Sequence, residues 1–333
     1  LPLSWAGFGA VMRMARIKVH GRSAVYHCMS RIVGGQAVLD DLGKEQLVRL
    51  LRQLATFSGI EVITYCMMSN HFHVLVRVPA EQNPSDAELV ERMEVLYGKK
   101  SALVQLARKA LAREGRVDGD LRKAMVERMG DVSAFMKELK QRFTRWYNRQ
   151  TGRFGTLWAE RFRSVLVEDQ PGTVETVAAY IDLNPVRAGM VKDPKDYRFC
   201  GYAAALAGNK AAQAGLMSFQ PARQWKEAAA EYRKRLFVGA GTAGRSEKVV
   251  LEREEILKVL ARGGELSRAQ VLRLRLRHMT DGVVLGSRGF VNEIFALHRE
   301  KFGVKRRDGA RPIRGVPLSG LSVLRDLRVR AVT

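Results

Sequence analysis

The chain has 333 residues, of which 46% are hydrophobic and 27% are charged, a composition that excludes intrinsic disorder and collagen-like repeats as its main state. Its 57 lysines and arginines against 34 aspartates and glutamates give a formal net charge of +23. This excess predicts a polyanionic partner, and the chemistry of individual residues must decide which one.

Membrane insertion and secretion are not expected. The longest uncharged run, residues 62–76, is too short to span a bilayer, and residues 1–12 are followed rather than preceded by arginine. Because the chain starts with Leu and its first methionines are Met12 and Met14, we expect residues 1–14 to be an unstructured or non-native leader.

The cysteines exclude a disulfide framework, because they are odd in number and far apart, and no C-x-x-C pair offers a zinc site. They are Cys28, Cys66 and Cys200. This pattern predicts a reducing compartment. Together with the basic charge, it predicts a cytoplasmic, nucleoid-associated protein that partners nucleic acid rather than a membrane.

The first predicted elements are a strand, a helix and a hairpin. Residues 23–30 are rich in β-forming side chains, and residues 44–57 carry leucines at helical spacing. Two further β-rich runs, residues 61–68 and 71–78, are separated by a Ser-Asn pair suited to a tight turn. An antiparallel hairpin is the natural interpretation.

Residues 80–130 are rich in Glu, Arg, Lys, Leu and Ala, which predicts a helical elaboration of the core. Its helices are expected over residues 86–97, 101–114 and 121–129. Residues 132–150 then predict a long basic helix, residues 158–167 a strand, and residues 173–184 a helix that stops before Pro185.

The predicted order is β-α-β-β, then helices, then β-α. This order favours an α+β fold with a ferredoxin-like antiparallel sheet, and we expect its helices on one face. The domain so defined covers residues 15–202.

The rest of the chain is expected to form a linker and a second unit. Two Ala/Gly-rich stretches, residues 203–215 and 239–244, predict a linker region over residues 203–245. Residues 246–333 predict a helical, basic C-terminal DNA-binding region, with a helix-turn-helix unit as one option. Its helices are expected over residues 252–261, 267–277 and 290–302.

The tail of this region is dense in cations, which predicts a phosphate-binding surface that holds nucleic acid without taking part in catalysis. The alternative is that its helices pack on the core and stabilise it. The tail cations assigned to nucleic-acid binding are Lys305, Arg306, Arg307, Arg311 and Arg314.

Two pairs of residues can carry chemistry. His71 and His73 alternate along a predicted strand, so both imidazoles point to one face and can chelate a divalent metal. Tyr180 and Asn184 stand four residues apart on a predicted helix, as a nucleophile and a third ligand. Taken singly, such residues are more often a polar pair on a solvated sheet face, a core tyrosine and a helix terminator.

Three segments occur in order along the chain: MMSNHFHVLV around the two histidines, WAERFRS from Trp158, and YIDLNPVRAG from Tyr180. Together they resemble the REP-associated tyrosine transposases of bacteria, which are single-tyrosine transposases of the HUH nuclease superfamily. The resemblance spans roughly residues 15–202 and leaves residues 246–333 outside.

The resemblance implies an enzyme that nicks and joins single-stranded or hairpin DNA at REP-like palindromes. By position, it implies that His71 and His73 hold a Mg²⁺ or Mn²⁺ ion. It also implies that Tyr180 is the nucleophile that forms a 5′-phosphotyrosine link, and that Asn184 is the third metal ligand.

Such a substrate calls for cations that bind phosphate near the nucleophile. The arginines expected to contact DNA are Arg145, Arg149, Arg161, Arg163 and Arg187. Trp158 and Phe162 lie among them in the sequence, and we expect both to be core residues.

Other functions stay open at this point. A protein of this fold can grip hairpin DNA or structured RNA as a catalytically silent regulator. A metallohydrolase can use the histidine pair with water as its nucleophile, although nearby carboxylates are lacking. In each case the protein is expected to be a monomer or a homodimer, and a trapped covalent protein–DNA adduct separates the three functions.

Overall fold

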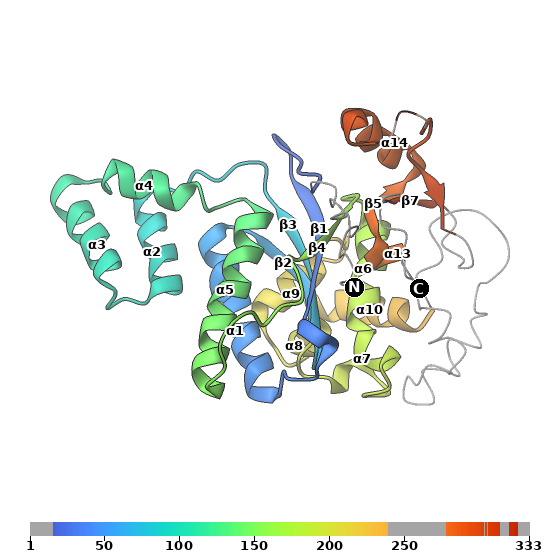
Figure 1. Ribbon diagram of the computed structural model, residues 1–333, viewed down its shortest axis with the longest axis horizontal. Helices are drawn as coiled ribbons and strands as arrows, with labels where there is room; N and C mark the ends of the chain where they lie inside the picture. Colours follow the sequence, from blue (N-terminus) through green and yellow to red (C-terminus); the bar gives the residue numbers. More distant parts are fainter. Residues whose placement is uncertain (1–15, 239–277, 303, 305, 314–319, 326–333) are drawn as a thin grey trace, which may run out of the picture.

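The computed structural model describes residues 16–238, 278–302, 304, 306–313 and 320–325 (Figure 1). The expected leader, the predicted helices 252–261 and 267–277, Lys305 and Arg314 lie outside the described residues. Within the described part of the chain, no helix is long and apolar enough to cross a bilayer.

Seven strands form one sheet, in the order β2-β3-β1-β4-β5-β7-β6. The strands are β1 (Ala24–Arg31), β2 (Glu61–Met67), β3 (His71–Val78), β4 (Arg163–Val167), β5 (Gly282–Ser287), β6 (Arg311–Pro312) and β7 (Leu321–Arg325). The helices are α1 (Asp41–Ser58), α2 (Asp86–Tyr97), α3 (Ala102–Glu114), α4 (Gly119–Val126), α5 (Val132–Thr151), α6 (Pro171–Asp182), α7 (Asn184–Arg187), α8 (Gly201–Leu206), α9 (Lys210–Met217), α10 (Trp225–Val238), α13 (His278–Asp281) and α14 (Arg288–Leu297). Short 3-10 helices cover Val33–Gly35, Pro194–Asp196 and Arg299–Lys301.

The predicted α+β fold and its antiparallel core are confirmed. β1 pairs antiparallel with β3 on one side and with β4 on the other, and β2 pairs antiparallel with β3. The strand predicted over residues 158–167 is shorter than expected, because β4 begins at Arg163 and Trp158 forms only an isolated bridge with Ile32.

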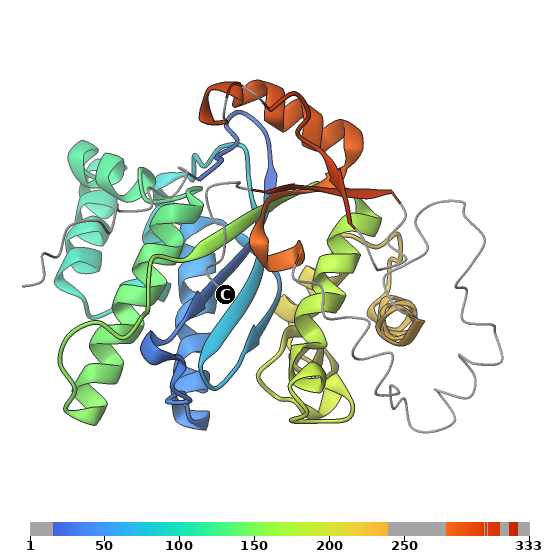
Figure 2. The same cartoon turned by 45° about the vertical axis from the view of Figure 1, so that its right-hand side comes forward.

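Helices cover both faces of this sheet, which corrects the expectation of helices on one face (Figure 2). Phe72 of β3 packs edge-on against Trp158, which in turn contacts Phe143 of α5. The next residue, His73, points the other way, toward Tyr180 of α6, because side chains alternate along a strand. All residues of β1 but the last are buried, a pattern typical of a strand covered on both faces.

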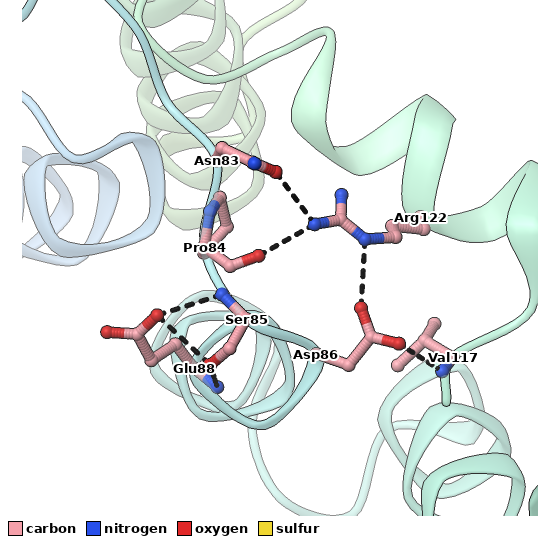
Figure 3. Close-up of polar contacts among 7 residues, drawn as sticks. All are labelled: Asn83, Pro84, Ser85, Asp86, Glu88, Val117 and Arg122. Atoms are coloured by element: carbon pink, nitrogen blue, oxygen red, sulfur yellow. Dashed lines mark hydrogen bonds and ion pairs between the residues drawn. The ribbon is translucent and has the colours of Figure 1, made fainter. Parts of the chain in front are cut away.

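Helices α2, α3 and α4 form the predicted elaboration and project from the body of the molecule beside α1 and α5 (Figure 1). Ser85 caps α2 in a capping box with Glu88. Arg122 of α4 lies across the same helix end and donates to Asp86 Oδ1 at 2.9 Å and to the Pro84 carbonyl at 2.8 Å (Figure 3). Arg122 therefore ties α4 to the start of α2.

Replacing Arg122 with alanine should loosen this extension. The variant leaves the partly buried Asp86 carboxylate without its cation, at a cost of about 1–3 kcal/mol. We expect faster amide hydrogen exchange in α2 and α4 than in the sheet. Lys123→Ala, at the exposed neighbouring position, is the control and should leave exchange unchanged. Equal protection in both variants would show that Arg122 is dispensable.

Residues 203–238 fold as helices, which corrects the expected linker over this part of the chain. α8 and α9 cover most of the first Ala/Gly-rich stretch, and alanine has the highest helix propensity of all residues. Gly215 lets α9 lie directly on edge strand β2, because a Cβ atom there would come within 2.3 Å of the Val62 carbonyl oxygen.

The described part of the C-terminal region extends the sheet, although no strand was predicted there. β5 pairs parallel with β4, and β7 lies antiparallel between β5 and β6. Glu168 fixes β5 by accepting hydrogen bonds from the Ser287 backbone N–H at 2.6 Å and its hydroxyl at 2.8 Å. α14 confirms the first part of the helix predicted over residues 290–302. These residues therefore join the core through strand pairing, whereas the alternative for this region expected helices packed on the core.

Candidate active site

A cavity of about 490 Å³ lies at one end of the central strands, where β1 ends and β3 and β4 begin. All the predicted catalytic and metal-ligand residues line it. His71 and His73 come from β3, Tyr180 from α6 and Asn184 from the start of α7. The fold therefore brings together residues from two distant parts of the sequence.

A third histidine, His27 of β1, stands behind His73 and was not predicted. His27 Nδ1 lies 3.0 Å from the Met279 carbonyl oxygen, and His27 Nε2 lies 2.9 Å from His73 Nδ1. Because a carbonyl oxygen only accepts, His27 Nδ1 carries the proton, and in the neutral ring its Nε2 accepts from His73 Nδ1–H. This arrangement leaves the lone pair of His73 Nε2 available to a ligand.

Asn70 fixes His71 in the same tautomer. The Asn70 amide nitrogen donates to the Gly35 carbonyl at 2.9 Å, which orients its oxygen toward His71. His71 Nδ1 lies 2.6 Å from that oxygen and must donate to it. The lone pair of His71 is therefore also on Nε2.

Burial keeps these imidazoles neutral. It lowers the pKa of His27 to about 4, and the pKa of His71 to about 4 with a smaller effect of Arg31 and Arg187. Burial, followed by His27 and His71, holds the pKa of His73 well below its ordinary value. Neutral imidazole is the form of histidine that binds metal ions.

Tyr180 lies edge-on beside the histidines in the lining of the cavity. Its ring centroid lies 6.0 Å from that of His27 and 6.1 Å from that of His73. The Arg187 guanidinium lies over the Tyr180 ring, 3.8 Å from its centroid, and donates to the Tyr180 carbonyl at 2.8 Å. A guanidinium in this position can hold a phosphate beside the phenol.

The helix that carries Tyr180 is anchored by a buried carboxyl. Asp182 accepts hydrogen bonds from Thr64 Oγ1 of β2 at 2.9 Å and from the Tyr232 hydroxyl of α10 at 2.7 Å. It also accepts from the Tyr202 backbone N–H of α8 at 3.2 Å. These contacts fix the end of α6 against the sheet, so the position of the phenol is set by the core.

Asn184 opens a separate short helix, which corrects the expectation that it shares a helix with Tyr180. α6 ends at Asp182, and Pro185 is tolerated because it lies in the first turn of α7, where its missing N–H is not needed. Asn184 still lines the cavity, and its Nδ2 atom is buried without a hydrogen-bond partner among the described residues. An unpaired buried polar atom points to a polar ligand.

Four of the five predicted DNA-contact arginines line this cavity or a neighbouring one. Arg161, Arg163 and Arg187 line the cavity of Tyr180, where Arg163 pairs with Glu160 at 2.9 Å. Arg145 lines a neighbouring cavity, and Arg149 is exposed near the end of the same helix, α5. Their contact with DNA stays a prediction. Trp158 and Phe162 are buried, as expected of core residues.

The tail cations also differ from one another. Arg306 is buried and donates to the carbonyl oxygens of Asp308, Gly309 and Arg325 at 2.8 to 3.1 Å. This finding corrects its assignment as a DNA contact, because a guanidinium enclosed in this way stabilises a turn and is not exposed to phosphate. Arg307 and Arg311 are exposed and remain predicted contacts.

The C-terminal region reaches the candidate active site, whereas the sequence predicted a separate role for it. The Met279 carbonyl holds His27, and Thr280 lines the cavity. The first described residues of this region therefore contribute to one wall of the site.

Comparisons with known proteins agree with part of this description. The sequence model of a family described as "Transposase IS200 like" matches residues 22–110, a segment that contains His71 and His73 and ends before Tyr180. Over these residues, the match agrees with the resemblance to a transposase family inferred from the sequence. One similar solved structure is titled "Structure of the REP associates tyrosine transposase bound to a REP hairpin", with a TM-score of 0.38 and 16% identity, covering 59% of this chain and 86% of that chain. No curated protein matches the sequence.

Proposed function

We propose that this chain, which carries an IS200-like transposase segment over residues 22–110, nicks and rejoins single-stranded DNA through Tyr180. The substrate class is DNA that folds into hairpins, as REP-like palindromes do. The proposal rests on the convergence, in one cavity, of a phenol, two neutral imidazoles with available Nε2 atoms, and several arginines. This set of groups suits transfer of a phosphodiester to a tyrosine.

The cavity also fits a divalent cation of the Mg²⁺ or Mn²⁺ type. Among the residues described, no three His, Cys, Asp or Glu side chains are placed to hold one ion together. An ion bound by His71 and His73 would therefore need further ligands whose oxygen atoms are not those of carboxylates. The Asn184 amide is one such ligand, because rotating it by half a turn replaces the unpaired Nδ2 with oxygen. A bound ion would polarise the phosphodiester and offset charge on the departing 3′ oxygen.

The residues of the chain account for the rest of the reaction. Arg187 holds the phosphate against the Tyr180 ring, and Arg31 and Arg161 add positive charge at the mouth of the cavity. The Tyr180 oxygen bonds to phosphorus, and the bond from phosphorus to the 3′ oxygen breaks. The phenol gives up one proton to water and the 3′ oxygen gains one, so no proton is consumed. Because the phosphotyrosine link retains the energy of the phosphodiester, a 3′-OH can reverse the step and join a strand.

An adduct assay tests this proposal. A hairpin oligonucleotide labelled at its 3′ end is incubated with the chain and Mn²⁺, and the mixture is separated on a denaturing gel. We expect the 3′ label to travel with the protein, whereas a 5′ label is released on a fragment ending in 3′-OH. Binding without cleavage would favour a silent regulator instead. Cleavage without an adduct would favour a metallohydrolase that uses water.

His27 should act as a positioning residue for His73. The variant His27→Phe keeps a ring in the core but removes the acceptor for His73 Nδ1–H, so His73 loses its fixed tautomer. Loss of such a partner typically lowers metal affinity by about 10–100-fold. We expect this loss in Mn²⁺ binding measured by electron paramagnetic resonance. His20→Phe makes the same change at an exposed site and should bind Mn²⁺ normally. Equal affinity in both variants would refute the role of His27.

A further inference from the structure

A second cavity, of about 1050 Å³, lies on the α5 side of the sheet, between α5 and the segment of residues 156–162. It shares Glu160 and Arg161 with the cavity of Tyr180. The two cavities therefore adjoin near the start of β4. We call the second cavity the α5 groove.

One wall of the α5 groove is a polar and basic stripe on α5. Lys137, Gln141 and Arg145 stand four residues apart, so they lie on one face of the helix, and all three are exposed. Lys140 and Thr144 line the groove between them. This spacing places two exposed cations about two helical turns apart along the groove.

Arg16 contributes a further cation that is already oriented. Its guanidinium packs on the Phe162 ring, 3.6 Å from the centroid, and donates to Ser164 Oγ, Ser133 Oγ and the Phe162 carbonyl at 2.8 to 3.1 Å. All these acceptors are neutral. The positive charge of Arg16 is therefore held in place without being cancelled by a bonded carboxylate.

Lys140 is buried at the base of the α5 groove. Its Nζ atom donates to the Glu160 backbone carbonyl at 2.6 Å, and burial lowers the pKa of its ammonium group to about 8. A buried ammonium is costly unless an anion accompanies it. Its position is thus more favourable when the groove holds a phosphate.

The charge of the α5 groove is strongly unbalanced. The cations that line it are Arg16, Lys137, Lys140, Arg145 and Arg161, and its one carboxylate, Glu160, pairs with Arg163. The aromatic residues Trp158 and Phe162 are buried, so they offer little surface on which a base can stack. The groove is therefore suited to the phosphates of a nucleic acid strand rather than to its bases.

We propose that the α5 groove binds the phosphates of a single-stranded DNA segment that continues from the strand held at Tyr180. The inference rests on the proposed function, because that function places DNA in the adjoining cavity. Arg161, which lines both cavities, marks the point where the strand crosses from one to the other. The remainder of the DNA, including its hairpin, lies outside the groove.

The test compares hairpins with single-stranded extensions of increasing length, on either the 5′ or the 3′ side. The double variant Lys137→Glu/Arg145→Glu changes exposed residues and should fold normally, as checked by circular dichroism. The control, Lys109→Glu/Lys123→Glu, makes the same change of charge on exposed positions of α3 and α4. Affinity is measured by fluorescence anisotropy over a range of salt concentrations, without divalent metal.

We expect the affinity of the wild type to rise with the length of the extension, on one side of the hairpin only. The groove variant should bind the extended hairpin about tenfold more weakly than the wild type does. Its salt dependence for extended DNA should fall by about 1.4 units of slope, since each phosphate contact on a single strand contributes about 0.7. The blunt hairpin should bind both variants equally. Equal losses in the two variants, or losses independent of the extension, would overturn the proposal. The assay needs no cleavage, so a missing Tyr180 adduct would refute the proposed function alone.

Discussion

The variant Tyr180→Phe should form no covalent adduct with DNA while binding hairpins as tightly as the wild type. The change removes one oxygen atom and keeps the ring, so Arg187 can still pack on it and the arginines of the cavity remain in place. Since the proposed step requires a bond between that oxygen and phosphorus, the expected loss is complete. The measurement is the amount of 3′-labelled DNA that travels with the protein on a denaturing gel.

Other tyrosines provide the control for this experiment. The Tyr197 hydroxyl donates to the Met67 carbonyl at 2.5 Å, and the Tyr147 hydroxyl lies 3.4 Å from the Val38 carbonyl. Neither residue lines the cavity of the histidines. Tyr147→Phe should therefore form the adduct at the wild-type rate. If Tyr180→Phe still forms the adduct and Tyr147→Phe does not, the nucleophile is Tyr147 and the proposed site is wrong.

The residues that line the candidate site were largely predictable because they belong to short motifs with a local geometric meaning. Alternation along a strand places His71 and His73 on one face whatever the rest of the fold. The same rule could have pointed to His27, which lies on a predicted strand, but only the pairing of β1 with β3 sets it beside His73. That pairing forms only in the folded protein and cannot be predicted from either segment alone.

The prediction of a linker after residue 202 was wrong for a different physical reason. An Ala/Gly-rich composition is shared by flexible linkers and by helices that pack closely, and only the neighbouring surface decides between them. Here β2, the outermost strand at one side of the sheet, supplies that surface, and Gly215 allows α9 to pack closely on it. The sequence shows the glycine at position 215, but it does not show that this glycine will lie against the Val62 backbone of β2.

The C-terminal strands were missed because they are short and pair with partners far away in the chain. β5 has the six-residue sequence GVVLGS, which is too short and too rich in glycine to predict a strand. It forms a strand because it pairs with β4. Its pairing is what carries Met279 to His27 and Thr280 to the cavity. Cationic composition suggested a binding tail, whereas part of the region is structural, as the buried Arg306 illustrates.

The double variant His71→Ala/His73→Ala should abolish cleavage that depends on Mg²⁺ or Mn²⁺. Both side chains present neutral imidazoles with their Nε2 lone pairs available, and no cluster of carboxylates among the described residues can take over. A metal ion supplies several kcal/mol of transition-state stabilisation, which corresponds to a loss of at least about 1000-fold in rate. Rates are measured on a labelled hairpin at saturating protein, and chelation by EDTA should reduce wild-type cleavage to the same level.

Asn184→Ala is the graded comparison for this prediction. Water can take the place of an amide oxygen on a metal ion, so the single change should slow cleavage much less than loss of the two imidazoles. Mn²⁺ binding should follow the same order, with the double histidine variant weakest, Asn184→Ala intermediate and the wild type strongest. If the double histidine variant cleaves DNA at the wild-type rate, the metal site lies elsewhere. If it binds Mn²⁺ normally but does not cleave, the histidines act directly on DNA rather than through an ion.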